Sequence, residues 1–84
     1  MTRYFFDIHD GIVVTDETGL ELPNIEAANT YAMKIVSDYA AKPGMVGIDG
    51  GVMVVTIRDG VESVLMRFRL VFNVEDFTEN GRRA

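Results

Sequence analysis

Two segments of the chain are rich in β-branched and aromatic residues, and each is interrupted by an Asp-Gly pair. The first segment covers residues 3–15 with Asp-Gly at 10–11, and the second covers residues 52–72 with Asp-Gly at 59–60. An Asp-Gly pair between two apolar runs is typical of a two-residue β-hairpin turn. The pattern therefore predicts two β-hairpins, one near each end of the chain.

Two-residue turns also predict which side chains share a face of each hairpin. They place Val13 opposite Ile8 and Met66 opposite Met53, and opposed residues of antiparallel strands lie on the same face. One face is then predicted to carry Tyr4, Phe6, Ile8, Val13, Met53, Val55, Ile57, Val64, Met66, Phe68, Leu70 and Phe72. The other face is predicted to carry Phe5, Asp7, His9, Ile12, Val14, Val52, Val54, Thr56, Leu65, Arg67, Arg69 and Val71.

Between the hairpins, residues 25–42 follow a helical period. Asn24 is positioned to cap the helix, Glu26 suits the positive end of the helix dipole, and Pro43-Gly44 ends the helix. Residues 20–23 are predicted to lead into the helix from a turn, and 45–51 to form a loop. The apolar stripe of the helix contains Ile25, Ala28, Ala32, Ile35, Val36 and Tyr39.

These elements predict an α+β fold of ββαββ order, with an antiparallel sheet of two hairpins and one amphipathic helix on one face. The chain has 84 residues and 48% hydrophobic residues, which is enough for one core. We therefore expect a single α+β domain over residues 1–72. Residues 73–84 are polar and are predicted to form a flexible C-terminal tail.

The charge balance bears on the class of partner. Asp and Glu number 13 against 8 Lys and Arg, for a net charge of -5, which argues against nucleic acid as a partner. Arg67 and Arg69 form a local basic pair that either receives an acidic partner or keeps the last strand soluble, and we favour solubility. No run has the length of a signal peptide or membrane span, so a cytoplasmic protein without membrane contact is expected.

Candidate chemistry is sparse, so no catalytic residue and no cofactor is predicted. Cysteine is absent, which removes disulfides and thiolate metal sites. Asp7 and His9 share a predicted strand face and are weak candidates for a metal site, the basis of a minimal metal-dependent hydrolase as one alternative. A stable site takes three or four ligands, so ordinary strand residues are the favoured interpretation.

The predicted face opposite the helix is more apolar than a solvated sheet face requires. One helix cannot cover both faces, which predicts that a second copy or another protein covers this one, with a folded-back tail as the rival. The favoured function is a non-enzymatic protein-interaction module that forms a homodimer. The predicted interface contains Phe5, Ile12, Val14, Val52, Val54, Leu65 and Val71.

Two blocks near the start of the chain carry a family resemblance. Met1-x-Arg3-Tyr4-Phe5-Phe6-Asp7 and Asp16-Glu17-x-Gly19-x-Glu21-Leu22-Pro23, followed by Glu26-Ala27-Ala28, resemble a family of short alphaproteobacterial proteins of unknown function. This resemblance implies fold-defining residues and no activity. The order of hairpin, turn and helix is also similar, more distantly, to HicB-type antitoxins. That likeness implies a further alternative, a regulator that binds a protein toxin or nucleic acid.

Overall fold

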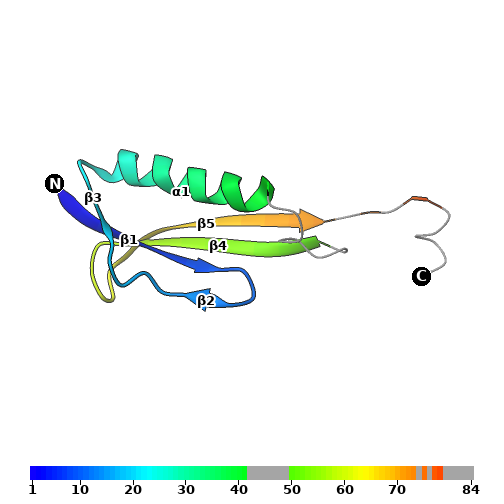
Figure 1. Cartoon of the computed structure of the whole chain (residues 1–84), viewed down its shortest axis with the longest axis horizontal. Coiled ribbons are helices and arrows are strands. Elements are labelled where there is room, and N and C mark those ends of the chain that lie inside the picture. Colours follow the sequence, from blue (N-terminus) through cyan, green and yellow to red (C-terminus); the bar gives the residue numbers. More distant parts are fainter. Residues whose placement is uncertain (42–49, 74, 76, 79–84) are drawn as a thin grey trace.

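A computed structural model describes residues 1–41, 50–73, 75, 77 and 78, and it consists of one helix lying on an antiparallel sheet (Figure 1). The α+β class is confirmed. The predicted helix end at Pro43-Gly44, the loop residues 45–49 and most of the predicted tail lie outside the described residues. The elements are β1 (Thr2–His9), β2 (Val13–Val14), β3 (Leu20–Leu22), α1 (Ile25–Ala41), β4 (Gly50–Arg58) and β5 (Val64–Asn73).

The sheet has five strands rather than the four that the sequence predicts. Its order is β2-β1-β4-β5, and β3 also pairs with β1. Residues 20–22, predicted as a connection into the helix, pair with Thr2–Tyr4, while β2 pairs with Ile8 and His9 further along the same strand. Gly50, Gly51 and Asn73, predicted as loop and tail, extend β4 and β5.

The register of the first hairpin differs by one residue from the prediction. Ile8 lies opposite Val14 rather than Val13, and His9 lies opposite Val13. The reason is a longer loop over residues 10–12, in which the Asp10 N–H donates to the Ile12 carbonyl at 3.3 Å and Gly11 has φ of 102°. A one-residue slip exchanges the two faces, so the predicted faces of Val13 and Val14 are wrong.

The register of the second hairpin differs by four residues. Met53 lies opposite Leu70 rather than Met66, because the connection spans residues 59–63, where the Asp59 N–H donates to the Ser63 carbonyl at 3.1 Å. The pairing shifts between Ile57 and Arg58, at a β-bulge or similar irregularity. The even slip leaves the residues paired from Gly51 to Ile57 and from Met66 to Phe72 on their predicted faces, whereas beyond the irregularity Val64 lies opposite Arg58.

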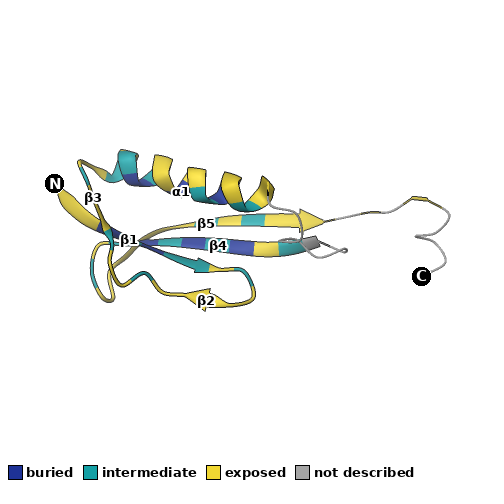
Figure 2. Ribbon diagram, in the orientation of Figure 1, coloured by how far each residue is buried: buried dark blue, intermediate teal, exposed yellow. Residues whose placement is uncertain are grey.

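The core lies between α1 and the sheet, as the helix stripe predicts. Ala28 and Ala32 are fully buried, and their small side chains allow the helix to lie close to the strands. Phe68 and Leu70 pack against the core, whereas Met66 and Phe72, predicted on this face near the two ends of β5, are exposed (Figure 2). Val64, also predicted here, is exposed and lies opposite Arg58. The buried core consists of Tyr4, Phe6, Ala28, Ala32, Val36, Met53, Val55 and Ile57.

The start of α1 has the predicted cap. The Asn24 side-chain oxygen accepts from the Ala27 N–H at 2.9 Å. Replacing Asn24 by alanine leaves this N–H without its acceptor, so the free energy of unfolding should fall by about 1 kcal/mol in urea denaturation. Asn24→Ser keeps a capping oxygen and should lose much less, whereas equal losses would contradict the capping role.

Polar residues cover the outward side of the same helix. Thr30, Lys34, Ser37 and Asp38 are all exposed. Among the described helical residues, no helix is long and apolar enough to cross a membrane.

Candidate functional site

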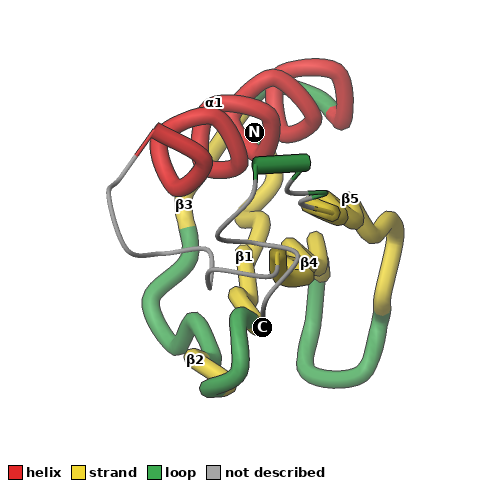
Figure 3. The backbone as a smooth tube through the Cα atoms, turned by 90° about the vertical axis from the view of Figure 1, so that its right-hand side faces the viewer, coloured by secondary structure: helices red, strands yellow, loops and turns green. Residues whose placement is uncertain are grey.

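The face of the sheet opposite α1, here called the open face, is covered by no helix or strand of the described part of the chain (Figure 3). Opposed residues in the observed registers share a face, and side chains alternate along each strand. The open face therefore carries Arg3, Phe5, Asp7, His9, Val13, Val52, Val54, Thr56, Arg58, Arg67, Arg69 and Val71.

One end of the open face is apolar and accessible. Val13, Val52 and Val71 are 63%, 55% and 60% exposed, and they lie near the hairpin loop over residues 10–12. A depression of about 420 Å³ lies here, lined by His9, Gly11, Val52, Val54 and Arg69. The structure thus has an apolar surface where the sequence predicts a partner.

Four of the seven residues in the predicted interface are placed on this face by the strand pairing. They are Phe5, Val52, Val54 and Val71, whereas Leu65 has no partner in the register, at the irregularity of β5. Val14 shares the face of Ile8, toward α1, and Ile12 lies in the hairpin loop, so neither belongs to the open face. Val13 lies on the open face instead of Val14, because the hairpin loop has three residues rather than the predicted two.

At the other end of the open face, Arg58 binds three segments together. Its Nε donates to Asp7 Oδ2 at 2.6 Å and its Nη2 to Asp7 Oδ1 at 3.1 Å. Nη2 also donates to the Asp16 carbonyl at 3.0 Å, and Nη1 donates to the Gly60 carbonyl at 2.8 Å. The guanidinium lies over the Phe5 ring, 5.1 Å from its centre. Arg58 therefore joins β1 to the loops on both sides of it.

Asp16 fills the gap between β2 and β3. Its Oδ2 accepts from the Phe6 N–H of β1 at 3.1 Å, and its Oδ1 accepts from the Thr18 and Gly19 N–H groups, each at 3.0 Å. The Asp16 N–H in turn donates to Asp7 Oδ1 at 2.9 Å. A side chain thus supplies the acceptor that a neighbouring strand would otherwise provide.

Both carboxylates are stabilised in their ionised form. Hydrogen bonds from Arg58 lower the pKa of Asp7 despite its partial burial. Burial raises the pKa of Asp16, but the N–H groups of Gly19, Phe6 and Thr18 outweigh it, so the net pKa is lowered. Ionised carboxylates already engaged by donors are poor general acids, and structural ion-pair networks also perturb pKa values. We therefore interpret Asp7, Asp16 and Arg58, here called the latch, as a structural cluster that holds β1 to the loops on both sides of it.

The alternative of a metal-dependent hydrolase depends on the Asp7 carboxylate. Both oxygens of Asp7 accept hydrogen bonds from Arg58. Asp7 and His9 share the open face, but residues 1–41, 50–73, 75, 77 and 78 contain no group of three or more His, Cys, Asp or Glu side chains suited to a metal ion. The described residues therefore offer no ligand set for the hydrolase alternative.

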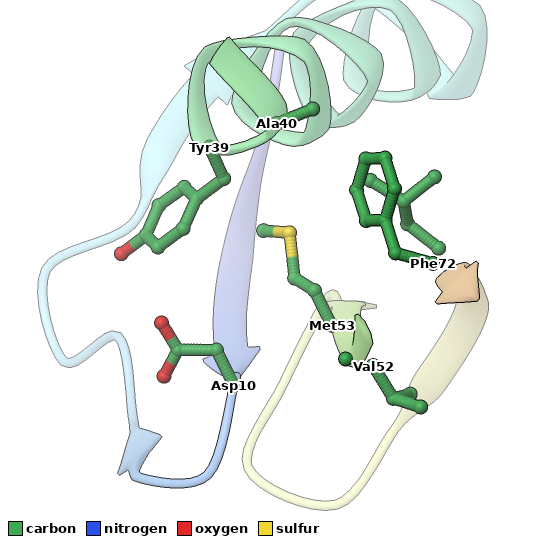
Figure 4. Close-up of a pocket in the computed structure, with 8 residues that line it drawn as sticks. Asp10, Tyr39, Ala40, Val52, Met53 and Phe72 are labelled. Carbon is green, nitrogen blue, oxygen red and sulfur yellow. The ribbon is translucent and has the colours of Figure 1, made fainter. Parts of the chain in front are cut away.

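Two other hollows border α1. A groove of about 420 Å³ runs between the helix and the edge where β2 and β3 meet β1, and in it Tyr31 packs on Phe6 with ring centres 4.8 Å apart. Beneath the end of α1, a cavity of about 20 Å³ lies between Tyr39 and Met53 (Figure 4). The cavity has room for roughly one water molecule, far below the roughly 300 Å³ of a small-molecule site.

Sequence comparison supplies a family and no activity. Residues 3–71 match the family described as "Domain of unknown function (DUF6894)". No curated protein and no solved structure matches the chain.

Proposed function

Since the chain belongs to DUF6894, a family whose function is unknown, we propose its role from its own surfaces: a non-enzymatic interaction module in which two copies pack their open faces together. The observation that carries the proposal is the exposed apolar end of the open face, here called the valine patch, formed by exposed Val13, Val52 and Val71 with half-buried Val54 beside them. Such a patch on a small protein is a common mark of an interface.

A second copy suits this patch for a physical reason. In a two-fold dimer the same surface meets itself, so the surface must be complementary to its own copy. An apolar valine patch meets that condition, and two sheet faces pack about 10 Å apart with their side chains interleaved. Arg67 lies on the outermost strand, β5, at the rim of such an interface, whereas Arg69 on the same strand lines the depression beside Val52 and Val54.

The size of the core supports the same proposal. Within the described residues only eight side chains are buried, and two of them are alanines. Domains of this size bury a small share of their surface and often gain stability from a partner subunit. Burial of the valine patch adds to the apolar area removed from water.

Light scattering on a sizing column tests the dimer with a matched pair of variants. Val52 is 55% exposed on the open face, and Val61 is 90% exposed in the 59–63 loop. We expect the wild-type protein to be a dimer at tens of micromolar. Val52→Lys should weaken it at least tenfold, roughly 1.4 kcal/mol, because it buries an unpaired ammonium, whereas Val61→Lys should leave it unchanged.

A wild-type protein that stays monomeric at every concentration would rule out self-association. The rival, a covering tail, is then tested by truncation after Asn73. Truncation should increase binding of a hydrophobic dye if the removed segment covers the open face, and should leave dye binding unchanged otherwise.

A further inference from the structure

The outer edge of β5 is a second surface with unused bonding groups. Val64–Asn73 is the last strand in the sheet order and pairs only with β4 among the described strands. A strand at the end of a sheet has alternate N–H and C=O groups directed outward. Ten residues are long for an edge strand, which natural proteins usually keep short or interrupted. The edge therefore has room for an added strand.

The two sides of β5 differ in chemistry. Toward α1 it carries Met66, Phe68 and Leu70, of which Met66 is 39% exposed. Toward the open face it carries Arg67 and Arg69, both exposed. The strand thus presents apolar residues on one side and positive charge on the other, in a protein of net charge -5.

This pattern disfavours pairing of two β5 strands along nearly their whole length. In such a pairing, with a two-fold axis at Phe68, Arg67 of each copy lies opposite Arg69 of the other copy. The arrangement therefore contains two pairs of opposed arginines. Like charges directly opposite on neighbouring strands are destabilising. The same two arginines favour a strand with acidic side chains at the facing positions.

We infer that the outer edge of β5 binds an extended acidic segment of another protein by strand addition. Backbone hydrogen bonds supply part of the affinity, and alternate side chains supply the specificity. Acidic residues of the segment lie beside Arg67 and Arg69, and apolar residues lie beside Met66, Phe68 and Leu70. The edge adjoins the valine patch at Arg69, but it uses the outward backbone groups of β5, which packing of the open faces does not engage, so the inference goes beyond self-association.

Fluorescence anisotropy with three labelled eight-residue peptides tests the inference. The first alternates Glu and Val, the second has the same composition in two blocks, and the third alternates Lys and Val. We expect the alternating Glu peptide to bind at least tenfold more tightly than either of the others. Equal binding of the block peptide would overturn strand addition, because only its alternation differs.

Matched variants locate the binding surface. Arg69→Glu should weaken binding of the alternating Glu peptide at least tenfold, whereas Lys34→Glu, the same charge reversal on the exposed side of α1, should not. Unchanged binding by folded Arg69→Glu would overturn the inference. Val52→Lys should bind the peptide normally even if dimerisation is lost, which separates this inference from the proposed function. Added peptide should also slow hydrogen exchange at alternate β5 amides.

Discussion

Replacing Arg58 by methionine should lower the free energy of unfolding by about 2–3 kcal/mol, measured by urea denaturation at pH 7. The change leaves Asp7 ionised without its partner, and a buried pair broken on one side typically costs about 3–5 kcal/mol. The estimate is smaller here because the side chains of Arg58 and Asp7 keep 13% and 20% of their exposure. The carbonyl groups of Asp16 and Gly60 also lose a donor.

Arg69→Met is the matched control, since Arg69 is an exposed arginine on the same face of the sheet. Its effect should stay within about 0.5 kcal/mol. A double-mutant cycle with Asp7→Asn should give a coupling energy above about 1 kcal/mol. Coupling near zero would mean that the latch does not hold the loops.

The same pair should be visible in the acid dependence of stability. The pKa of Asp7 is lower in the folded state than the ordinary value of 3.8. Its stabilising contribution is therefore present above that value and is lost as the pH falls through the lower native pKa. In Arg58→Met the native pKa of Asp7 rises, so wild type and variant should converge in stability as the pH is lowered from about 5. A constant difference would contradict this account.

Among Gly11, Gly19 and Gly60, replacement of Gly19 by alanine should be the most damaging, with a loss of about 2–4 kcal/mol in thermal or urea unfolding. Gly19 has φ of +75°, which alone costs an alanine about 1 kcal/mol. An added Cβ would also lie 2.8 Å from Arg3 Cγ and 2.8 Å from a Phe5 ring carbon, and overpacking of this kind costs about 1–3 kcal/mol. The Phe5 ring in turn supports Arg58.

Two other glycines separate these contributions. Gly11 has φ of +102° with nothing within 4 Å of an added Cβ, so Gly11→Ala should show the backbone cost alone, about 1 kcal/mol. Gly60 has no positive φ, and its nearest neighbour to a Cβ is Ser63 at 3.8 Å, so Gly60→Ala should be nearly neutral. Equal losses at Gly11 and Gly19 would show that the contact with Phe5 is unimportant.

The helix could be predicted well because its determinants are local. The cap at Asn24 and the stripe from Ile25 to Tyr39 depend only on spacing within the segment. The strand registers could not, because they depend on loop hydrogen bonds that an Asp-Gly pair does not specify. An odd error exchanged Val13 and Val14, whereas an even error in the second hairpin left its faces intact up to the pair of Ile57 and Met66.

The latch was missed for a different reason. The sequence pattern predicts an ordinary solvated arginine for Arg58, because it stands at the end of a strand. Its partner Asp7 lies 51 residues away in sequence. β3 was missed because three residues give too short a pattern, and its pairing depends on Asp16 bridging the gap before it. The one available signal was local: Asp16 stands two and three residues before Thr18 and Gly19, a spacing typical of a side-chain turn.

The central position of β1 has a consequence for synthesis on the ribosome. β1 meets β2 and β3 soon after it emerges, but its other edge waits for β4, which follows the whole of α1 in the chain. Contacts between distant segments close slowly, since loop-closure entropy is lost before the contacts form. We therefore expect the free edge of β1 in the nascent first half to remain unpaired until β4 has been translated.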